Sequence, residues 1–371
     1  YNWAGVVPLP PTASIPAPPL PAVTIRLSPD DIYVSEPANT VYIADALANV
    51  VYAVPMAAPN AMHIIAGTGV VGCSYPGIGG AGPADAAELK YPTHVVAAAG
   101  PTGTTVFISD SGNYCVRRVD VPTNTMDTWA GQCSVPGGAG SVTAGLIATH
   151  AHLPAIGALA LHPHTGDLYF VSDVSLEHVY YVESGSGVLM DAYIAGAIPA
   201  GIGGIVFNGA GLLLGTDTDG CRVWSFPTST TESLVAGAGC GPPPTAPTPA
   251  LAVTFGHPYA MAYDSYHDVV YFATNDDGVA LAIHGPKVYP SVGNAAGVPD
   301  CGPGTAVSQT QLASLGVHPT VGLFVGSTTT YNVLNYQPGA MRPCTSPSPT
   351  PSYTPSQTAT GTSTPSVTAA V

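Results

Sequence analysis

Charged side chains are scarce in this sequence. Asp, Glu, Lys and Arg make up 8% of its 371 residues, and the formal net charge of −15 arises because only seven residues are Lys or Arg. Proteins bind nucleic acid through clustered cations that displace its counterions. We therefore expect no nucleic-acid partner.

Long apolar runs and several functional motifs are also missing. A membrane-spanning helix needs roughly 20 consecutive apolar residues, and no stretch approaches that length, so we expect no membrane span. The sequence has no Asn-x-Ser/Thr sequon, no CxxC pair and no G-x-S-x-G motif. The glycine-rich segment 77–82 reads as a connection rather than a nucleotide-binding loop, because no helix pattern follows it. We predict no cofactor and no catalysis.

Turn-forming residues are abundant instead. The chain holds 43 Gly and 39 Pro, which favours turn-rich β structure over helices. Its seven cysteines lack zinc-site spacing and indicate an oxidising compartment. The sequence starts at Tyr1 rather than Met, as expected after removal of a signal peptide. We predict a secreted, extracellular or cell-surface protein.

A repeated strand pattern is the most informative feature. Six pairs of short apolar strands recur, at 41–54, 106–119, 168–182, 213–226, 270–283 and 323–336. A further strand ending in a small residue and glycine follows each of the first five pairs, at 66–67, 130–131, 195–196, 236–237 and 292–293. Repeats of tens of residues are typical of propellers and solenoids.

The sixth pair lacks this last strand, but the N-terminus supplies a match. Trp3-Ala4-Gly5 repeats the Trp-Ala-Gly sequence that ends at Gly131. We predict that the N-terminal strand docks beside residues 331–336 and closes the ring, which removes exposed terminal repeats. The predicted fold is all-β: a six-bladed β-propeller over residues 1–344, with blade six completed by residues 1–5.

The segment 66–131 resembles an NHL repeat. It contains GTGVVGCSYPGIGGAGPADAAELKYPTHVVAAA, FISDSGNYCVRRVD and TWAG in this order. The resemblance spans about residues 1–340 and implies the six-bladed fold but no single task, because the family includes ligand-binding modules, scaffolds and a few enzymes. Some NHL propellers resemble lyases that hold zinc through histidines in the central channel. By this resemblance His94 would face that channel.

Other histidines and a repeated aspartate are weaker candidates for metal ligands. A zinc site needs three or four converging ligands, whereas positions that match the histidines are apolar in other repeats, such as Ile156 and Ala260. We interpret the repeated carboxylates as turn residues that accept backbone N–H groups and predict no metal. The histidines are His150, His152, His162 and His164, and the repeated positions are Asp45, Asp110, Asp173, Asp217, Asn275 and Ser327.

Equal positions in two repeats suggest the disulfides. We predict Cys115–Cys133 and Cys221–Cys240, which are 18 and 19 residues apart, each closing a loop that contributes about 3 kcal/mol. Cys301–Cys344 would then tie the start of the tail to blade five. Cys73 remains unpaired or intermolecular, with Cys73–Cys115 as the competing assignment.

The composition changes at the C-terminus. Ser, Thr and Pro supply 19 of the 27 residues in 345–371, a composition that cannot bury a core and favours an extended polyproline II tail. The Ser-Pro and Thr-Pro dipeptides resemble O-glycosylated hydroxyproline-rich glycoproteins. The predicted glycosylation sites are Thr345, Ser346, Pro347, Ser348, Pro349, Thr350, Pro351, Ser352, Thr354, Pro355 and Ser356.

These observations favour an extracellular structural protein that self-associates into a filament resembling a flagellar hair (mastigoneme), with glycans on the tail that lies along the next subunit. Contacts that do not close on themselves generate such filaments. The alternatives are a monomeric secreted module that binds protein or carbohydrate and, third, a metal-dependent lyase or lactonase.

Overall fold

The computed structural model describes residues 2–4, 20–21, 27–57, 61–73, 82–137, 142–172, 178–194, 201–226, 232–293, 312–327 and 332–336. Strands dominate this part of the chain. Its helices are three-residue 3-10 turns: η1 (Ala84–Ala86), η2 (Ser111–Asn113), η3 (Ala148–His150) and η4 (Ala250–Ala252). None of the helices in these ranges has the length and apolar content needed to cross a membrane.

Five blades are each folded from one continuous stretch of chain. The first contains β2 (Leu20–Pro21), β3 (Pro29–Ser35), β4 (Thr40–Asp45), β5 (Val50–Pro55) and β6 (Ala61–Ala66). The second contains β7 (Gly82–Pro83), β8 (Pro92–Gly100), β9 (Gly103–Asp110), β10 (Cys115–Asp120) and β11 (Thr125–Gly131). The third contains β12 (Ile156–Leu161), β13 (Leu168–Ser172), β14 (His178–Val182) and β15 (Leu189–Ile194).

The fourth and fifth blades complete this set. The fourth contains β16 (Ile202–Phe207), β17 (Leu213–Asp217), β18 (Arg222–Phe226) and β19 (Ser233–Ala236). The fifth contains β20 (Thr248–Pro249), β21 (Pro258–Asp264), β22 (Val269–Thr274), β23 (Val279–His284) and β24 (Lys287–Gly293). The predicted all-β propeller is confirmed.

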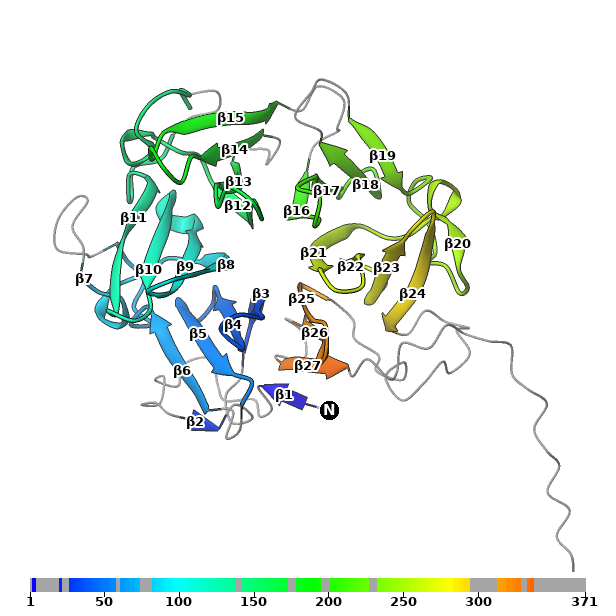
Figure 1. The fold of residues 1–371 in the computed structure, drawn as a ribbon, viewed down its shortest axis with the longest axis horizontal. Helices are drawn as coiled ribbons and strands as arrows, with labels where there is room; N and C mark the ends of the chain where they lie inside the picture. Colours follow the sequence, from blue (N-terminus) through cyan, green and yellow to red (C-terminus); the bar gives the residue numbers. More distant parts are fainter. Residues whose placement is uncertain are drawn as a thin grey trace, which may run out of the picture.

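A sixth sheet joins the two ends of the chain. It contains β25 (Ser314–His318), β26 (Gly322–Ser327), β27 (Asn332–Tyr336) and, at its outer edge, β1 (Asn2–Ala4). Asn2 pairs with Leu334 and Ala4 with Val333, so the predicted docking of the N-terminal strand, which includes Trp3, is confirmed. Gly5 lies outside the described residues. Figure 1 shows dark-blue β1 beside orange β27.

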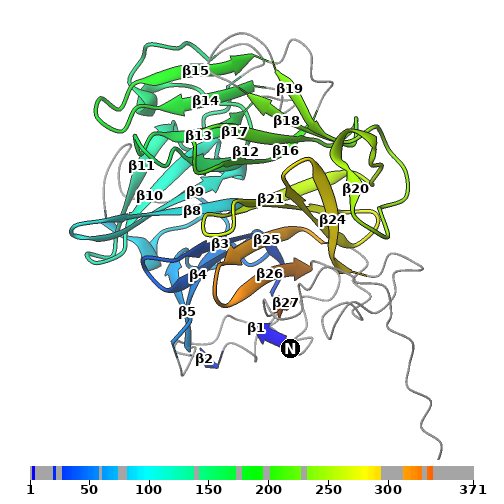
Figure 2. The same cartoon turned by 45° about the vertical axis from the view of Figure 1, so that its right-hand side comes forward.

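The innermost strands of the six sheets surround the centre of the molecule (Figure 1). Around the ring, β3, β8, β12, β16, β21 and β25 each contact the next, and β25 contacts β3. Figure 2 shows the same sheets stacked side by side from an oblique direction. The contacts form a closed circle of six strands.

The core lies between neighbouring sheets because both faces of each central strand are apolar. Along β4, Val41 and Ile43 pack toward the sixth sheet, where they meet Phe324. Tyr42 and Ala44, which alternate with them, pack toward the second blade. Side chains along a strand alternate between its two faces, so one short apolar strand contributes to two interfaces.

The repeated small-residue–glycine ends have a steric cause. Gly67, Gly131 and Gly237 adopt φ values of +94°, +83° and +104°. A Cβ atom at any of the three would lie 2.4–2.5 Å from a backbone oxygen of the turn that precedes β5, β10 or β18. Glycine is required because the outer strand ends against that turn in a left-handed conformation.

Candidate functional site

A cavity of about 460 Å³ lies among the innermost strands of all six sheets. The lining residues come from β3, β8, β12, β16, β21 and β25, the strands nearest the centre of the molecule in Figure 1. We refer to this cavity as the central channel. The channel is therefore a site to which every sheet contributes, and its chemistry is set by a few positions on short strands.

Acidic groups set the charge of this channel. Asp30, Asp31 and Glu36 line it together with His94, and its described lining includes no Lys or Arg. Asp31 and His94 occupy equal positions of their blades, because Asp31 pairs with Ala44 of β4 and His94 with Ser109 of β9, each just after an irregularity in the strand pairing. The sequence-based placement of His94 at the channel is confirmed, whereas Asp30 and Asp31 were missed.

A local irregularity of β3 brings both aspartates to the channel. Regular alternation would send adjacent side chains to opposite faces, but the register shifts between Pro29 and Asp31, and such bulges re-aim side chains. The Asp31 Oδ2 atom accepts a hydrogen bond from the Val95 N–H at 2.9 Å, and the Asp30 Oδ2 atom accepts one from the Ala46 N–H at 3.0 Å. Each carboxylate is fixed in place by backbone.

Partial burial shifts the protonation equilibria in the channel. Desolvation raises the pKa of Asp31 to about 7, with a smaller contribution from the negative charge of Asp30. Desolvation likewise raises the pKa of Asp30 to about 6 and lowers the pKa of His94 to about 4. Near neutral pH the imidazole is therefore uncharged, while the two carboxyl groups exchange protons readily.

Aromatic side chains complete the lining. Tyr33, Phe207, Tyr259 and Tyr263 all border the cavity. Burial raises the pKa of Tyr33 to about 12 and also raises the pKa of Tyr259, to which Asp30 and Asp31 contribute. The phenols thus stay protonated as donors. The channel combines hydrogen-bond acceptors, hydrogen-bond donors and ring faces, which suits a small polar ligand.

The other predicted histidines do not join this site. The Nδ1 atom of His162 accepts the N–H groups of His164 and Thr165, as in a turn, and its ring packs on Phe207. His150 ends η3. Neither these residues nor His152 belong to the groups of metal-ligating atoms found among the described residues.

The repeated aspartates are the last residues of β4, β9 and β17, and their carboxylates accept backbone N–H groups, as predicted. Asp45 accepts the N–H groups of Ser28 and Ala48, and Asp217 accepts that of Gly220. Asp110 accepts the Lys90 N–H. Asp173 lies outside the described residues.

The disulfides correct one prediction and confirm another. Cys221–Cys240 is present, with a Cα–Cα distance of 4.9 Å. Cys133 is bonded to Cys73, with a Cα–Cα distance of 6.3 Å, and Cys115 is a buried free thiol. The predicted Cys115–Cys133 pair, the alternative Cys73–Cys115 pair and the unpaired state of Cys73 are therefore wrong. Cys301 and Cys344 lie outside the described residues, as do the predicted glycosylation sites between Thr345 and Ser356.

The wrong pairing arose from a shift of one residue between two repeats. Val116 pairs with Ala130, and Val223 pairs with Ala236, so the position equal to Cys115 is Arg222 and the position equal to Cys221 is Tyr114. Adjacent residues point in different directions. Cys115 consequently points into blade two, where its Sγ atom faces the Asp110 carboxylate at 3.9 Å.

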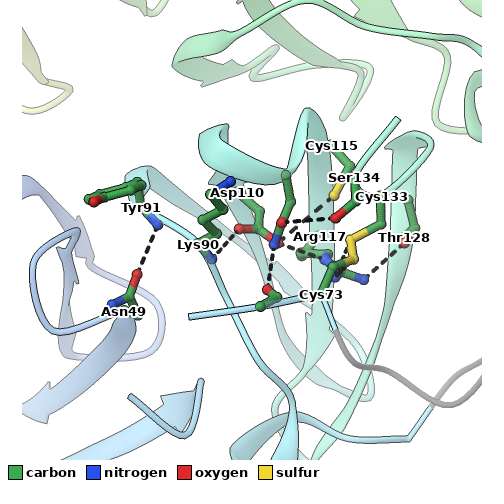
Figure 3. A network of polar contacts seen from close by, with 12 residues as sticks. Asn49, Cys73, Lys90, Tyr91, Asp110, Cys115, Arg117, Thr128, Cys133 and Ser134 are labelled. Atoms are coloured by element: carbon green, nitrogen blue, oxygen red, sulfur yellow. Dashed lines mark hydrogen bonds and ion pairs between the residues drawn. A yellow bond between two sulfur atoms is a disulfide. The ribbon is translucent and has the colours of Figure 1, made fainter. Parts of the chain in front are cut away.

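Around Cys115, blade two holds a buried polar cluster (Figure 3). The Arg117 Nε atom donates to the Asp110 Oδ2 atom at 3.0 Å, with side-chain exposures of 3% and 0%. The Arg117 Nη2 atom lies 3.1 Å from the Cys73 Sγ atom and 2.8 Å from that of Cys133. The cluster thus joins an ion pair, a disulfide and a free thiol. The sequence signal that we overlooked was an arginine two residues after a cysteine in a chain with seven basic residues.

Comparison with known proteins establishes the fold alone. No protein-family model and no curated protein matches the sequence. An auxiliary nutrient binding protein from Bacteroides ovatus is 10% identical, with a TM-score of 0.61, and the alignment covers 90% of this chain and 75% of that one. A structural-genomics protein of unknown function from Bacteroides thetaiotaomicron is 12% identical, with a TM-score of 0.62 and coverages of 90% and 74%. Virginiamycin B lyase from Staphylococcus aureus is 10% identical, with a TM-score of 0.50 and coverages of 82% and 93%.

Proposed function

We propose that this protein is a secreted, non-catalytic binding protein that holds a small polar ligand in its central channel. The observation that carries the proposal is the cavity of about 460 Å³ lined by Asp30, Asp31, Tyr33 and Tyr259. Its acidic lining favours a ligand that donates hydrogen bonds or carries a positive charge, such as a sugar or an organic ammonium ion. Carboxylates and aromatic rings recognise both.

The proposal also includes the domain architecture of the chain. The sixth sheet is the closing blade of a six-bladed propeller of NHL type, and residues 345–371 form a separate O-glycosylated tail. Two disulfides support an oxidising location outside the cytosol. The similarity in fold to a nutrient binding protein is consistent with a binding role.

The test is a binding titration of the full chain with choline and with a panel of neutral disaccharides. The Asp31→Asn variant keeps the acceptor for the Val95 N–H but removes the charge, and we expect it to weaken the binding of choline at least roughly ten-fold. Asp191→Asn, at an exposed position of β15, removes the same charge far from the channel and is expected to bind like the native protein. Equal choline affinities for both variants, or no binding of either ligand class, would refute the proposal.

The pH dependence separates the two ligand classes. An ammonium ligand needs ionised carboxylates, so its affinity is expected to fall as the pH drops through about 7 and then about 6, the pKa values of Asp31 and Asp30. A neutral sugar accepts and donates hydrogen bonds with either protonation state, so its affinity is expected to change much less over the same range.

Self-association into a filament is a second proposal, favoured by an exposed apolar surface on blades one and two. Leu47, Val70, Val71 and Tyr91 are each at least half exposed. They lie on connected turns, because the Tyr91 N–H donates to Asn49 and Val71 pairs with Leu89. Such patches mark interaction surfaces.

Electron microscopy of the native material tests the filament proposal. Deleting residues 345–371, or replacing both Leu47 and Val71 with Ser, is expected to abolish filaments. Replacing exposed Leu251 on η4 with Ser is the control and is expected to leave them intact. Native protein that stays monomeric in light scattering at high concentration would exclude this function.

A further inference from the structure

We propose that blade two contains a thiol–disulfide exchange site, in which Cys115 displaces Cys73 from Cys133 and leaves Cys73 as a free thiol. The proposal is independent of the ligand in the central channel. It concerns three sulfur atoms, the carboxylate of Asp110 and the guanidinium of Arg117, which Figure 3 shows close together.

The first requirement is a nucleophile within reach of the disulfide. The Sγ atoms of Cys115 and Cys133 and a carboxylate oxygen of Asp110 all lie within 4.8 Å of one another. Reacting atoms must approach to about 3–3.5 Å, so the Cys115 side chain needs to move by no more than about 2 Å. Cys115 is fully buried and no bulk solvent competes for its proton.

The second requirement is a base. Burial raises the pKa of Cys115, and the negative charge of Asp110 adds to this effect, so the thiol is protonated before it reacts. The Cys115 Sγ–H group points at the Asp110 Oδ2 atom. Burial also raises the pKa of Asp110, against the opposing effect of Arg117, and this makes the carboxylate a better proton acceptor.

The third requirement is stabilisation of the leaving thiolate. The guanidinium of Arg117 is held by Asp110 through Nε and by Thr128 through Nη1. Its Nη2 atom is the group that contacts the Cys73 and Cys133 sulfurs. A cation at this position lowers the cost of negative charge on the departing sulfur.

The step is redox-neutral. The Cys115 proton passes to Asp110, the Cys115 sulfur forms a bond with the Cys133 sulfur, and the Cys73–Cys133 bond breaks with its electron pair on Cys73. Asp110 then returns the proton to the Cys73 thiolate. No external oxidant or reductant is consumed.

Both pairings keep one disulfide and one thiol within blade two. The observed bond joins residues 60 apart, whereas the exchanged bond joins residues 18 apart. Loop-closure entropy acts on the unfolded chain, so it favours neither bond within the folded protein. Cys73 is half-buried, so its released thiol becomes the attachment point for a molecule that carries a disulfide.

Native-state alkylation with iodoacetamide tests the exchange. Chymotryptic cleavage after Phe107, Tyr114 and Trp129 puts the three cysteines into separate peptides. In the full chain we expect carbamidomethyl label on Cys73 together with a new Cys115–Cys133 disulfide. Oxidised glutathione is expected to place a glutathione on the same residue.

The Cys115→Ala variant is the decisive comparison. It removes only the nucleophile, and we expect it to abolish the labelling of Cys73. The Cys221–Cys240 pair is the internal control and is expected to stay unlabelled in both proteins. Asp110→Asn keeps one acceptor oxygen but removes the base and is expected to slow labelling on the order of 100-fold.

Three results would overturn the proposal: no label on Cys73 while the protein stays folded, equal labelling of Cys73 with and without Cys115, or label on Cys115 beside an intact Cys73–Cys133 bond. Near-ultraviolet circular dichroism of each variant shows that it is folded.

Discussion

Blades two and four solve the same packing problem with different side chains. In each blade an aspartate is the last residue of a strand, Asp110 on β9 and Asp217 on β17. Its carboxylate needs a hydrogen-bond donor from the next strand, β10 or β18. Blade two uses Arg117, whose Nε atom donates to Asp110, and blade four uses Trp224 at the equal register position, whose Nε1 atom donates to Asp217 at 3.4 Å. The charged solution brings a cation, and with it the sulfur cluster, into blade two. With the neutral solution, blade four holds one disulfide, between buried Cys221 and exposed Cys240.

The largest expected effect comes from removing the charge in blade two. Arg117→Met leaves the buried Asp110 carboxylate without its cation and is expected to lower the free energy of unfolding by about 3–5 kcal/mol. Urea unfolding measures the change. A loss below about 1 kcal/mol would show that the backbone donor from Lys90 and the side-chain donor from Asn113 suffice, and the contrast between the blades would disappear.

Removing a disulfide is expected to affect the two blades differently, because blade two contains a third cysteine, Cys115. Cys240→Ala opens the only pairing that Cys221 has among the described residues and is expected to cost about 3 kcal/mol. Cys73→Ala opens the longer loop, worth about 4 kcal/mol, but Cys133 then pairs with Cys115 and recovers most of it. The expected net loss is about 1 kcal/mol.

The double variant Cys73→Ala/Cys115→Ala checks this reasoning, because it has no partner left for Cys133. Its loss of stability is expected to return to about 4 kcal/mol. If the single and the double variants unfold at the same urea concentration, Cys115 does not rescue the blade.

Replacement of the strand-ending glycines should affect both blades alike. Gly131→Ala and Gly237→Ala place a Cβ atom 2.5 Å from the Tyr114 and Cys221 backbone oxygens, respectively. Together with the positive φ, we expect a loss of about 2 kcal/mol in each case, read from the midpoint of thermal unfolding. Unequal losses would mean that the Cys221–Cys240 disulfide limits how far the turn at Cys221 can move away from the added Cβ atom.

The repeat pattern predicted these shared features because their causes are local. Alternating apolar residues fix a strand with two buried faces, and a left-handed strand end demands glycine, so Ala130-Gly131 and Ala236-Gly237 could be recognised without coordinates. The match of Trp3-Ala4 to the same pattern located the edge strand of the sixth sheet. These inferences needed only the spacing of the repeats and the steric requirement for glycine at the end of the outer strand.

The site chemistry was less predictable because it depends on single-residue register. The spacing of 18 rather than 19 residues between the cysteines of blade two was visible, but only the strand pairing shows that it turns Cys115 inward. Asp30 and Asp31 share the channel because of an irregularity after Pro29 that the sequence repeats at Pro92-Thr93-His94. Aligning these prolines would have placed Asp31 beside His94 in the channel.

The smallest expected effect belongs to the neutral donor of blade four. Trp224→Phe removes one long hydrogen bond, while Asp217 retains the Gly220 N–H at 2.7 Å, so the expected loss is about 1 kcal/mol in urea unfolding. Because Trp224 is only partly buried, water can reach the freed oxygen and offset part of that loss. A cost equal to that of Arg117→Met would mean that the buried carboxylate dominates both blades and that the identity of its donor is secondary. A small cost would instead support the view that the charge in blade two serves the three sulfurs that surround it.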